Sequence, residues 1–273
     1  MKTVSFLLLL SLLVAACDRK NDDAILARGS SFRLIRTDYY GVPANASWFR
    51  STRYEYDANN ILREVVSENP DGTVDNKLIY NWVNSHTLRV EHHFTNSPWS
   101  SSIQSGRPLK MYSYNEFVFN PDTTIRERKN YTLDNDQPQT RSYTTYEYDL
   151  RKRITRRTHY SLDGKPGSYT VFEYNTQDNV IRETLYSNVS TTSEPNIIYT
   201  YEYDNAPNPY RLTRMDADIS WYMSRNNIVR QQSVNLASGI TSDERWTYEY
   251  RPDGYPARQV YADGRKEEFI YNR

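Results

Sequence analysis

Pairs of acidic residues recur along the chain with a spacing of two. The clearest pairs are Glu55/Asp57, Glu147/Asp149 and Glu202/Asp204. In a β-strand, residues two apart lie on the same face, so each pair would bring two carboxyl groups together. Such pairs can hydrolyse glycosidic bonds or bind calcium. Because the pairs recur with Arg63, Arg153 and Arg211 on neighbouring segments, we favour an architectural role, in which charges pair across strands on a water-facing surface.

The four histidines do not form a recognisable site. They are His86, His92, His93 and His159. His92 and His93 are adjacent in one expected strand, so they would point to opposite faces and could not bind one ion together. The chain also lacks a Gly-x-Ser-x-Gly motif and the Cys/His spacing of zinc sites. We therefore predict a non-enzymatic protein with no catalytic residue, no metal and no cofactor, in which the histidines are structural.

Trp99 is the best candidate for contact with a ligand. It lies in the polar segment 96–102, which interrupts the regular pattern and is predicted to be an inserted loop. An exposed indole ring can stack on a sugar. The alternative is that the loop folds back and Trp99 covers an edge of the sheet, since single exposed aromatic residues are common.

Cys17 is the only cysteine and follows a short export signal. Lys2 supplies a positive charge, residues 6–13 are mainly apolar, and Ala15 and Ala16 directly precede the cysteine. This arrangement resembles the bacterial lipobox, which implies that Cys17 is acylated and becomes the mature N-terminus. The alternatives are an ordinary signal peptide or a short anchor, although the apolar run is too short to span a bilayer comfortably.

These features divide the chain into three parts. Residues 1–16 are predicted to be the lipoprotein signal peptide, 17–29 a lipidated tether, and 30–273 a single β domain. The chain contains 34 basic and 34 acidic residues, so no overall field attracts nucleic acid. The expected partners are a membrane, through the lipid anchor, and an envelope protein or a glycan.

A short aromatic pattern repeats through the β domain. Two aromatic or apolar residues stand two apart and are followed, in most copies, by Asp or Asn. The copies begin at Tyr54, Leu78, Phe117, Tyr146, Phe172, Tyr201, Trp221, Tyr248 and Phe269. Alternation of this kind is typical of half-buried antiparallel strands, and a polar turn then leads to an aliphatic strand start such as Ile228-Val229-Arg230 after the Trp221 copy.

The second strand of each unit ends in a further turn. Asp71-Gly72, Asp163-Gly164 and Asp263-Gly264 are typical hairpin signals. We therefore predict an all-β fold of serial antiparallel β-hairpins, forming one long twisted or partly rolled sheet, with no helix after the signal. The tyrosine hydroxyls are expected to stay at the sheet margin in water.

The repeat resembles the YD repeat of Rhs and teneurin proteins. Tyr-x-Tyr-Asp, a polar turn, an aliphatic-Arg step and Asp-Gly follow one another over most of residues 50–273. Together with the lipobox, the chain looks like the YD-type lipoproteins of Bacteroidota. The chain departs from the YD pattern because the glycine after the Asp is mostly replaced and the repeats are longer. The resemblance implies stacked hairpins, but no toxin delivery, since no cargo domain is present in the sequence.

Our expectation is therefore an envelope lipoprotein, anchored at the outer membrane on its periplasmic or its external side, with a binding or scaffolding role. The alternative is a carbohydrate-binding accessory lipoprotein of a glycan-uptake system. An enzyme would instead need a concave pocket in which acids from different repeats converge.

Overall fold

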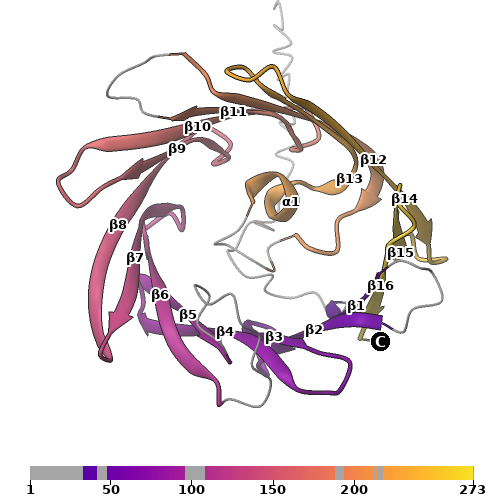
Figure 1. Ribbon diagram of the computed structural model, residues 1–273, viewed down its shortest axis with the longest axis horizontal. Helices are drawn as coiled ribbons and strands as arrows, with labels where there is room; N and C mark the ends of the chain where they lie inside the picture. The colour runs from indigo at the N-terminus through magenta and orange to yellow at the C-terminus, as the bar shows by residue number, and fades with distance from the viewer. Residues whose placement is uncertain are drawn as a thin grey trace, which may run out of the picture.

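The computed structural model describes residues 33–41, 48–95, 108–187, 194–211, 213 and 218–272. Within these residues, sixteen β-strands form a closed barrel in which every pairing is antiparallel (Figure 1). Each strand pairs with its neighbours in sequence, so the prediction of serial antiparallel hairpins is confirmed. No helix of the described residues is long and apolar enough to cross a membrane.

The strands follow one another around the barrel in sequence order. The first eight are β1 (Leu34–Tyr40), β2 (Trp48–Tyr56), β3 (Leu62–Glu68), β4 (Val74–Asn84), β5 (Thr87–Phe94), β6 (Lys110–Phe119), β7 (Ile125–Asp134) and β8 (Gln137–Tyr148). The remainder are β9 (Ile154–Tyr160), β10 (Pro166–Tyr174), β11 (Val180–Ser187), β12 (Ile197–Pro207), β13 (Asn226–Asn235), β14 (Thr241–Tyr250), β15 (Pro256–Tyr261) and β16 (Lys266–Tyr271). One short helix, α1 (Ile219–Met223), lies between β12 and β13.

The first and last strands close the barrel. Thr37 of β1 lies opposite Phe269 of β16, and the backbone N–H of Asn272 donates to the Arg33 carbonyl at 3.0 Å. The prediction of one long twisted or partly rolled sheet is therefore wrong on one point, because the sheet closes. Closure satisfies the backbone groups that an edge strand would leave exposed, and local sequence patterns cannot reveal a pairing between residues so far apart.

The aromatic residues of the repeat share one buried face, as predicted, and that face is the inner face of the barrel. Tyr54 is 6% exposed, and Tyr201 is 8% exposed. The expectation that the tyrosine hydroxyls stay in water is wrong. In each of six copies, one tyrosine hydroxyl donates to a backbone carbonyl of a neighbouring strand. These bonds join Tyr56 to Leu34, Tyr148 to Ile125, Tyr174 to Ile154, Tyr203 to Val180, Tyr248 to Ile228 and Tyr271 to Pro256. The hydroxyl thus joins successive hairpins, which phenylalanine could not do.

The Asp or Asn after the second aromatic residue shapes the turn. The Asp57 side chain accepts the backbone N–H groups of Asn59 and Ile61, both at 2.9 Å, and Asp149 accepts those of Arg151 and Arg153 in the same way. The turn also needs a left-handed residue four positions after the second aromatic. Asn60, Thr123, Lys152 and Asp178 occupy this position with positive φ, and Gly254 does so in a later copy.

Thr123 is the least suitable of these residues, because a β-branched side chain is strained at φ 73°. We expect Thr123→Gly to increase the free energy of unfolding by about 0.5–1 kcal/mol. The substitution removes the strain of the left-handed conformation, and the larger conformational entropy that glycine loses on folding offsets part of this gain. Chemical denaturation measures this difference. Asn60→Gly is the matched control and should change stability little, because asparagine tolerates this conformation. Equal effects of the two substitutions would contradict the explanation.

The outward face of the wall carries ion pairs between neighbouring strands around the barrel. They join Arg53 to Glu68, Lys77 to Glu64, Arg89 to Glu116, Arg156 to Glu147, Arg182 to Glu173, Arg230 to Glu202 and Asp243, and Arg258 to Glu249 and Glu268. At the turns, Asp57 pairs with Arg63, and Asp149 with Arg153. The acidic residues of the repeat therefore have the architectural role predicted for them.

Candidate functional site

A segment between β12 and β13 enters the barrel lumen, and we call its described residues, 208–211, 213 and 218–225, the plug (Figure 1). The prediction that no helix follows the signal is wrong, because α1 lies here. The supposed repeat copy at Trp221 is this helix. The aromatic partner of Ile228 is instead Tyr203, which lies opposite it in the β12–β13 pairing. One repeat is therefore split by an insertion, and Arg211 lies in the plug rather than on the wall.

Aromatic contacts and hydrogen bonds hold the plug against the inner wall. The Tyr210 ring packs edge-on against Phe269 at 5.5 Å between centroids, and Trp221 packs against Trp246 at 5.2 Å. The Tyr210 hydroxyl donates to Glu267, whose pKa is raised by burial although Tyr210 and Thr37 partly offset this effect. The plug is therefore fastened on the side of β14 and β16.

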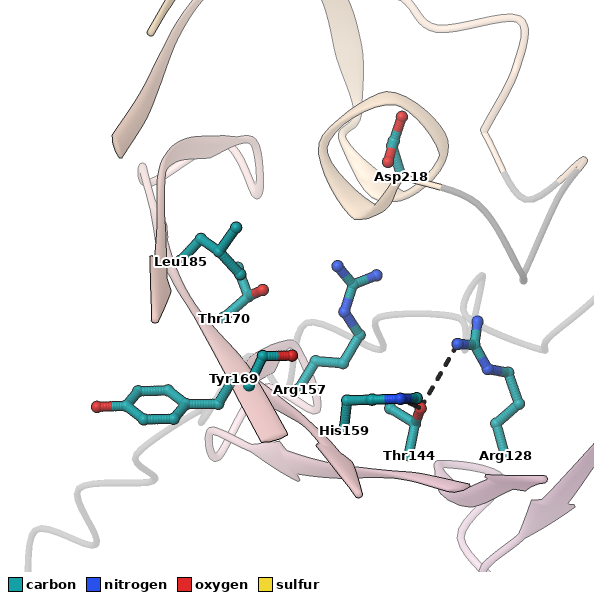
Figure 2. A pocket seen from close by; sticks show the side chains of 9 residues that line it. Arg128, Thr144, Arg157, His159, Tyr169, Thr170, Leu185 and Asp218 are labelled. Atoms are coloured by element: carbon teal, nitrogen blue, oxygen red, sulfur yellow. Dashed lines mark hydrogen bonds between the residues drawn. The ribbon is translucent and has the colours of Figure 1, made fainter. Parts of the chain in front are cut away.

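A cavity of about 300 Å³ lies on the opposite side of the lumen, between the wall and the start of α1 (Figure 2). Its lining comes from five consecutive strands, β7 to β11, and from the plug. The lining residues are Arg128, Thr144, Arg157, His159, Ser168, Tyr169, Thr170, Leu185 and Asp218. Arg128 and Arg157 give it a cationic wall, with His159 between them in Figure 2, and Asp218 at the start of α1 also lines the cavity.

A β-bulge turns Arg157 and His159 toward the lumen. Ile154 lies opposite the inward Tyr148, but Arg157, three residues later, lies opposite the inward Tyr146. Strict alternation from Ile154 would place Arg157 on the outside. The extra residue reverses the alternation after the turn, so Arg157 and His159 face inward.

The Thr144 hydroxyl lies between Arg128 and His159. Arg128 donates to the Thr144 hydroxyl at 3.5 Å, and the same hydroxyl lies 3.5 Å from Nδ1 of His159. Both distances are long for hydrogen bonds. Burial lowers the pKa of His159, and the charges of Arg128 and Arg157 lower it further. His159 is therefore neutral at pH 7, and the two guanidinium groups provide the positive charge.

Glu183 adjoins this cavity on β11. Its Oε1 atom is buried without a hydrogen-bond partner, and burial raises the pKa of the carboxyl group. Arg157 counteracts that shift, and Asp218 adds to it.

The predicted site residues fall largely elsewhere. Cys17 and Trp99 lie outside the described residues, and so do segments 1–32 and 96–107. His92 and His93 point to opposite faces as predicted, His92 toward Asn115 and His93 toward Glu91. Among the described residues, no group of three or more His, Cys, Asp or Glu could hold a metal ion.

Comparison with known proteins gives structural neighbours only. No family model matches the chain, and no curated protein matches its sequence. A porin-like protein from Bacteroides uniformis superposes with a TM-score of 0.56 at 12% identity, covering 89% of this chain and 98% of its own. The fold is that of a porin-like barrel. A second porin-like protein, from Bacteroides vulgatus, gives 0.52 at 9% identity, covering 88% and 98%.

These neighbours establish the fold and leave the YD-repeat resemblance a prediction. Of the cavity residues, the sequence pointed to His159, as one of four structural histidines, but not to Arg128, Arg157 or Asp218. The repeat itself was the only signal that Arg157 and His159 face inward. Other copies of the repeat also have a bulge at the start of the strand after the turn, and Arg157 lies three residues after the aliphatic residue that begins this strand.

Proposed function

We propose that the chain is a non-enzymatic binding protein of the bacterial cell envelope, held to the outer membrane by a lipid on Cys17 while its barrel stays in water. The observation that carries this proposal is the ring of ion pairs on the outward wall. A barrel that spans a membrane presents an apolar band about 25 Å tall, and each Arg or Lys at its midplane costs about 2–4 kcal/mol. With such a wall, attachment to a membrane needs a separate anchor.

The lumen supports a binding role rather than free conduction. The plug occupies one side, and the cavity beside it is lined by groups that can bind a polar ligand. A carbohydrate-binding accessory role is the more specific candidate, favoured by the hydroxyl groups of Thr144, Ser168 and Thr170 in the cavity.

The test replaces residues 1–17 with a signal peptide that an ordinary signal peptidase removes. The native chain is expected to incorporate labelled palmitate and to fractionate with membranes in a Gram-negative host. The exchanged protein should be folded and soluble in the periplasm. If the exchanged protein stays in membranes after an alkaline carbonate wash, the wall itself is inserted and the proposal fails. Absence of palmitate from the native chain would reject the lipid anchor.

A further inference from the structure

The cavity between β7–β11 and the plug is lined by the guanidinium group of Arg157. Among the described residues, Arg157 forms no hydrogen bond or ion pair. It lies over the Phe172 ring at 5.8 Å, and its charge acts on the buried Glu183. In Figure 2 its guanidinium group points into the cavity, beside that of Arg128. An arginine that forms no ion pair or hydrogen bond with its neighbours can bind an external oxyanion with its planar set of donors.

Asp218, at the start of α1, lines the same cavity from the plug. It precedes α1, yet its side chain makes no capping hydrogen bond to the helix. No ion pair joins it to another described residue. Its carboxylate can therefore accept hydrogen bonds from a ligand whose anionic group lies at Arg157, so the cavity has two poles of opposite charge.

The size and the remaining lining narrow the choice of ligand. A volume of about 300 Å³ is at the lower end of the range for ligand pockets. Thr144, Ser168 and Thr170 add hydroxyl groups that both donate and accept, whereas Leu185 is the one aliphatic residue of the lining. The Tyr169 ring points away from the cavity (Figure 2). This lining suits a body the size of one sugar ring, rich in hydroxyl groups.

We propose that this cavity binds a small ligand in which an oxyanion is attached to a hydroxylated body, such as a sugar acid or a sugar phosphate. Arg128, Arg157 and His159 receive the oxyanion, and Asp218 accepts hydrogen bonds from the hydroxyl groups. The inference rests on the proposed binding role and adds the class of ligand to it. It does not depend on the anchor, because binding is measured with purified protein in solution.

His159 makes this binding dependent on pH. It is neutral at pH 7, and a proton gained at lower pH would add a third positive charge to the cationic wall. The groups that face it or lie nearby are Arg128, Arg157, Asp218 and Glu183. Burial raises the pKa of Glu183, and its protonation at low pH acts in the same direction. We therefore expect at least threefold tighter binding at pH 5.5 than at pH 7.5, and a smaller change in His159→Gln.

The decisive experiment is calorimetric titration of the purified protein with glucuronate, glucose 6-phosphate, inorganic phosphate and glucose. Glucuronate or glucose 6-phosphate should bind at least tenfold more tightly than glucose, and the stronger of the two identifies carboxylate or phosphate as the preferred oxyanion. Arg157→Gln should weaken that binding at least tenfold. Arg156→Gln is the matched control, because the neighbouring Arg156 lies over the outward Tyr169 ring at 3.9 Å, and it should have no effect.

Asp218→Asn separates a hydroxylated ligand from a bare anion. The substitution should weaken the sugar acid or sugar phosphate several-fold, whereas it should leave inorganic phosphate unchanged or bound more tightly, because a negative charge is removed. Thermal unfolding of each variant verifies folding. Equal affinity for glucose and glucuronate, an unchanged affinity in Arg157→Gln, or no binding of any probe at millimolar concentration by folded protein would overturn the proposal. If inorganic phosphate is the one probe that binds, the proposal that the ligand carries hydroxyl groups is wrong.

Discussion

Replacing Phe269 by alanine is expected to lower the free energy of unfolding by about 3–5 kcal/mol. Phe269 is 6% exposed and lies on β16, the strand that closes the barrel by pairing with β1. Its ring also packs against Tyr210 of the plug. One substitution therefore removes apolar contacts of the wall and the plug together, and it leaves a cavity that the rigid strands cannot fill.

Ile270→Ala is the matched control for this prediction. Ile270 is the next residue on β16, but it is 39% exposed on the outward face and lies opposite Arg36. We expect its loss to cost less than about 1 kcal/mol. Denaturant unfolding compares the two variants, and hydrogen exchange locates the effect. Phe269→Ala should increase amide exchange in β1 and β16 more than in β7 to β9. Equal destabilisation by the two substitutions would contradict the assignment of faces at the closing strand.

The wall of the barrel was predictable from sequence because each hairpin is a local structure. Tyr54 and Tyr56, two residues apart, were enough to indicate an inward face, and Asp71-Gly72 marked a hairpin turn. Closure was not predictable in this way. It depends on Leu34 and Tyr271 meeting across the whole length of the chain, and no local period contains that information.

The candidate site was not predictable for a different physical reason. The bulge after Ile154 reverses the alternation of faces, so Arg157 lies inside although strict periodicity from Ile154 places it outside. Part of the plug was not recognised from the sequence because it looks like a copy of the repeat. Trp221, Tyr222 and Met223 imitate the spacing of the aromatic pair, whereas their contacts with Trp246 and Tyr210 belong to a short helix in the lumen.

Replacing Asp204 by alanine is expected to lower the free energy of unfolding by about 2–4 kcal/mol, the second largest effect that we predict. Its carboxylate accepts the backbone N–H groups of Ala206 at 2.9 Å and Asn227 at 3.1 Å. It also accepts the Asn227 side-chain amide and the Tyr250 hydroxyl. Asn227 is 3% exposed, so its N–H group would be left buried without a partner.

Asp204 keeps the hydrogen-bond pattern of the repeat although the plug is inserted after it. In an uninterrupted copy, Asp57 accepts the N–H groups two and four residues later, those of Asn59 and Ile61. Asp204 makes the first of these bonds to Ala206, but Asn227 takes the place of the second partner, beyond the plug. The same carboxylate that shapes a turn elsewhere here joins β12 to β13, the two strands that flank the plug.

Glu202→Ala tests this explanation with a residue from the same repeat copy. Glu202 lies on the outward face, and its ion pair with Arg230 is solvent-exposed, so we expect its loss to cost at most about 1 kcal/mol. Asp204→Asn should have an intermediate effect, since it keeps one acceptor oxygen. Limited proteolysis of folded protein should cut within 208–225 sooner in Asp204→Ala than in Glu202→Ala. If both variants are cut at the same rate, Asp204 does not hold the plug, and the aromatic contacts with Phe269 and Trp246 carry that role alone.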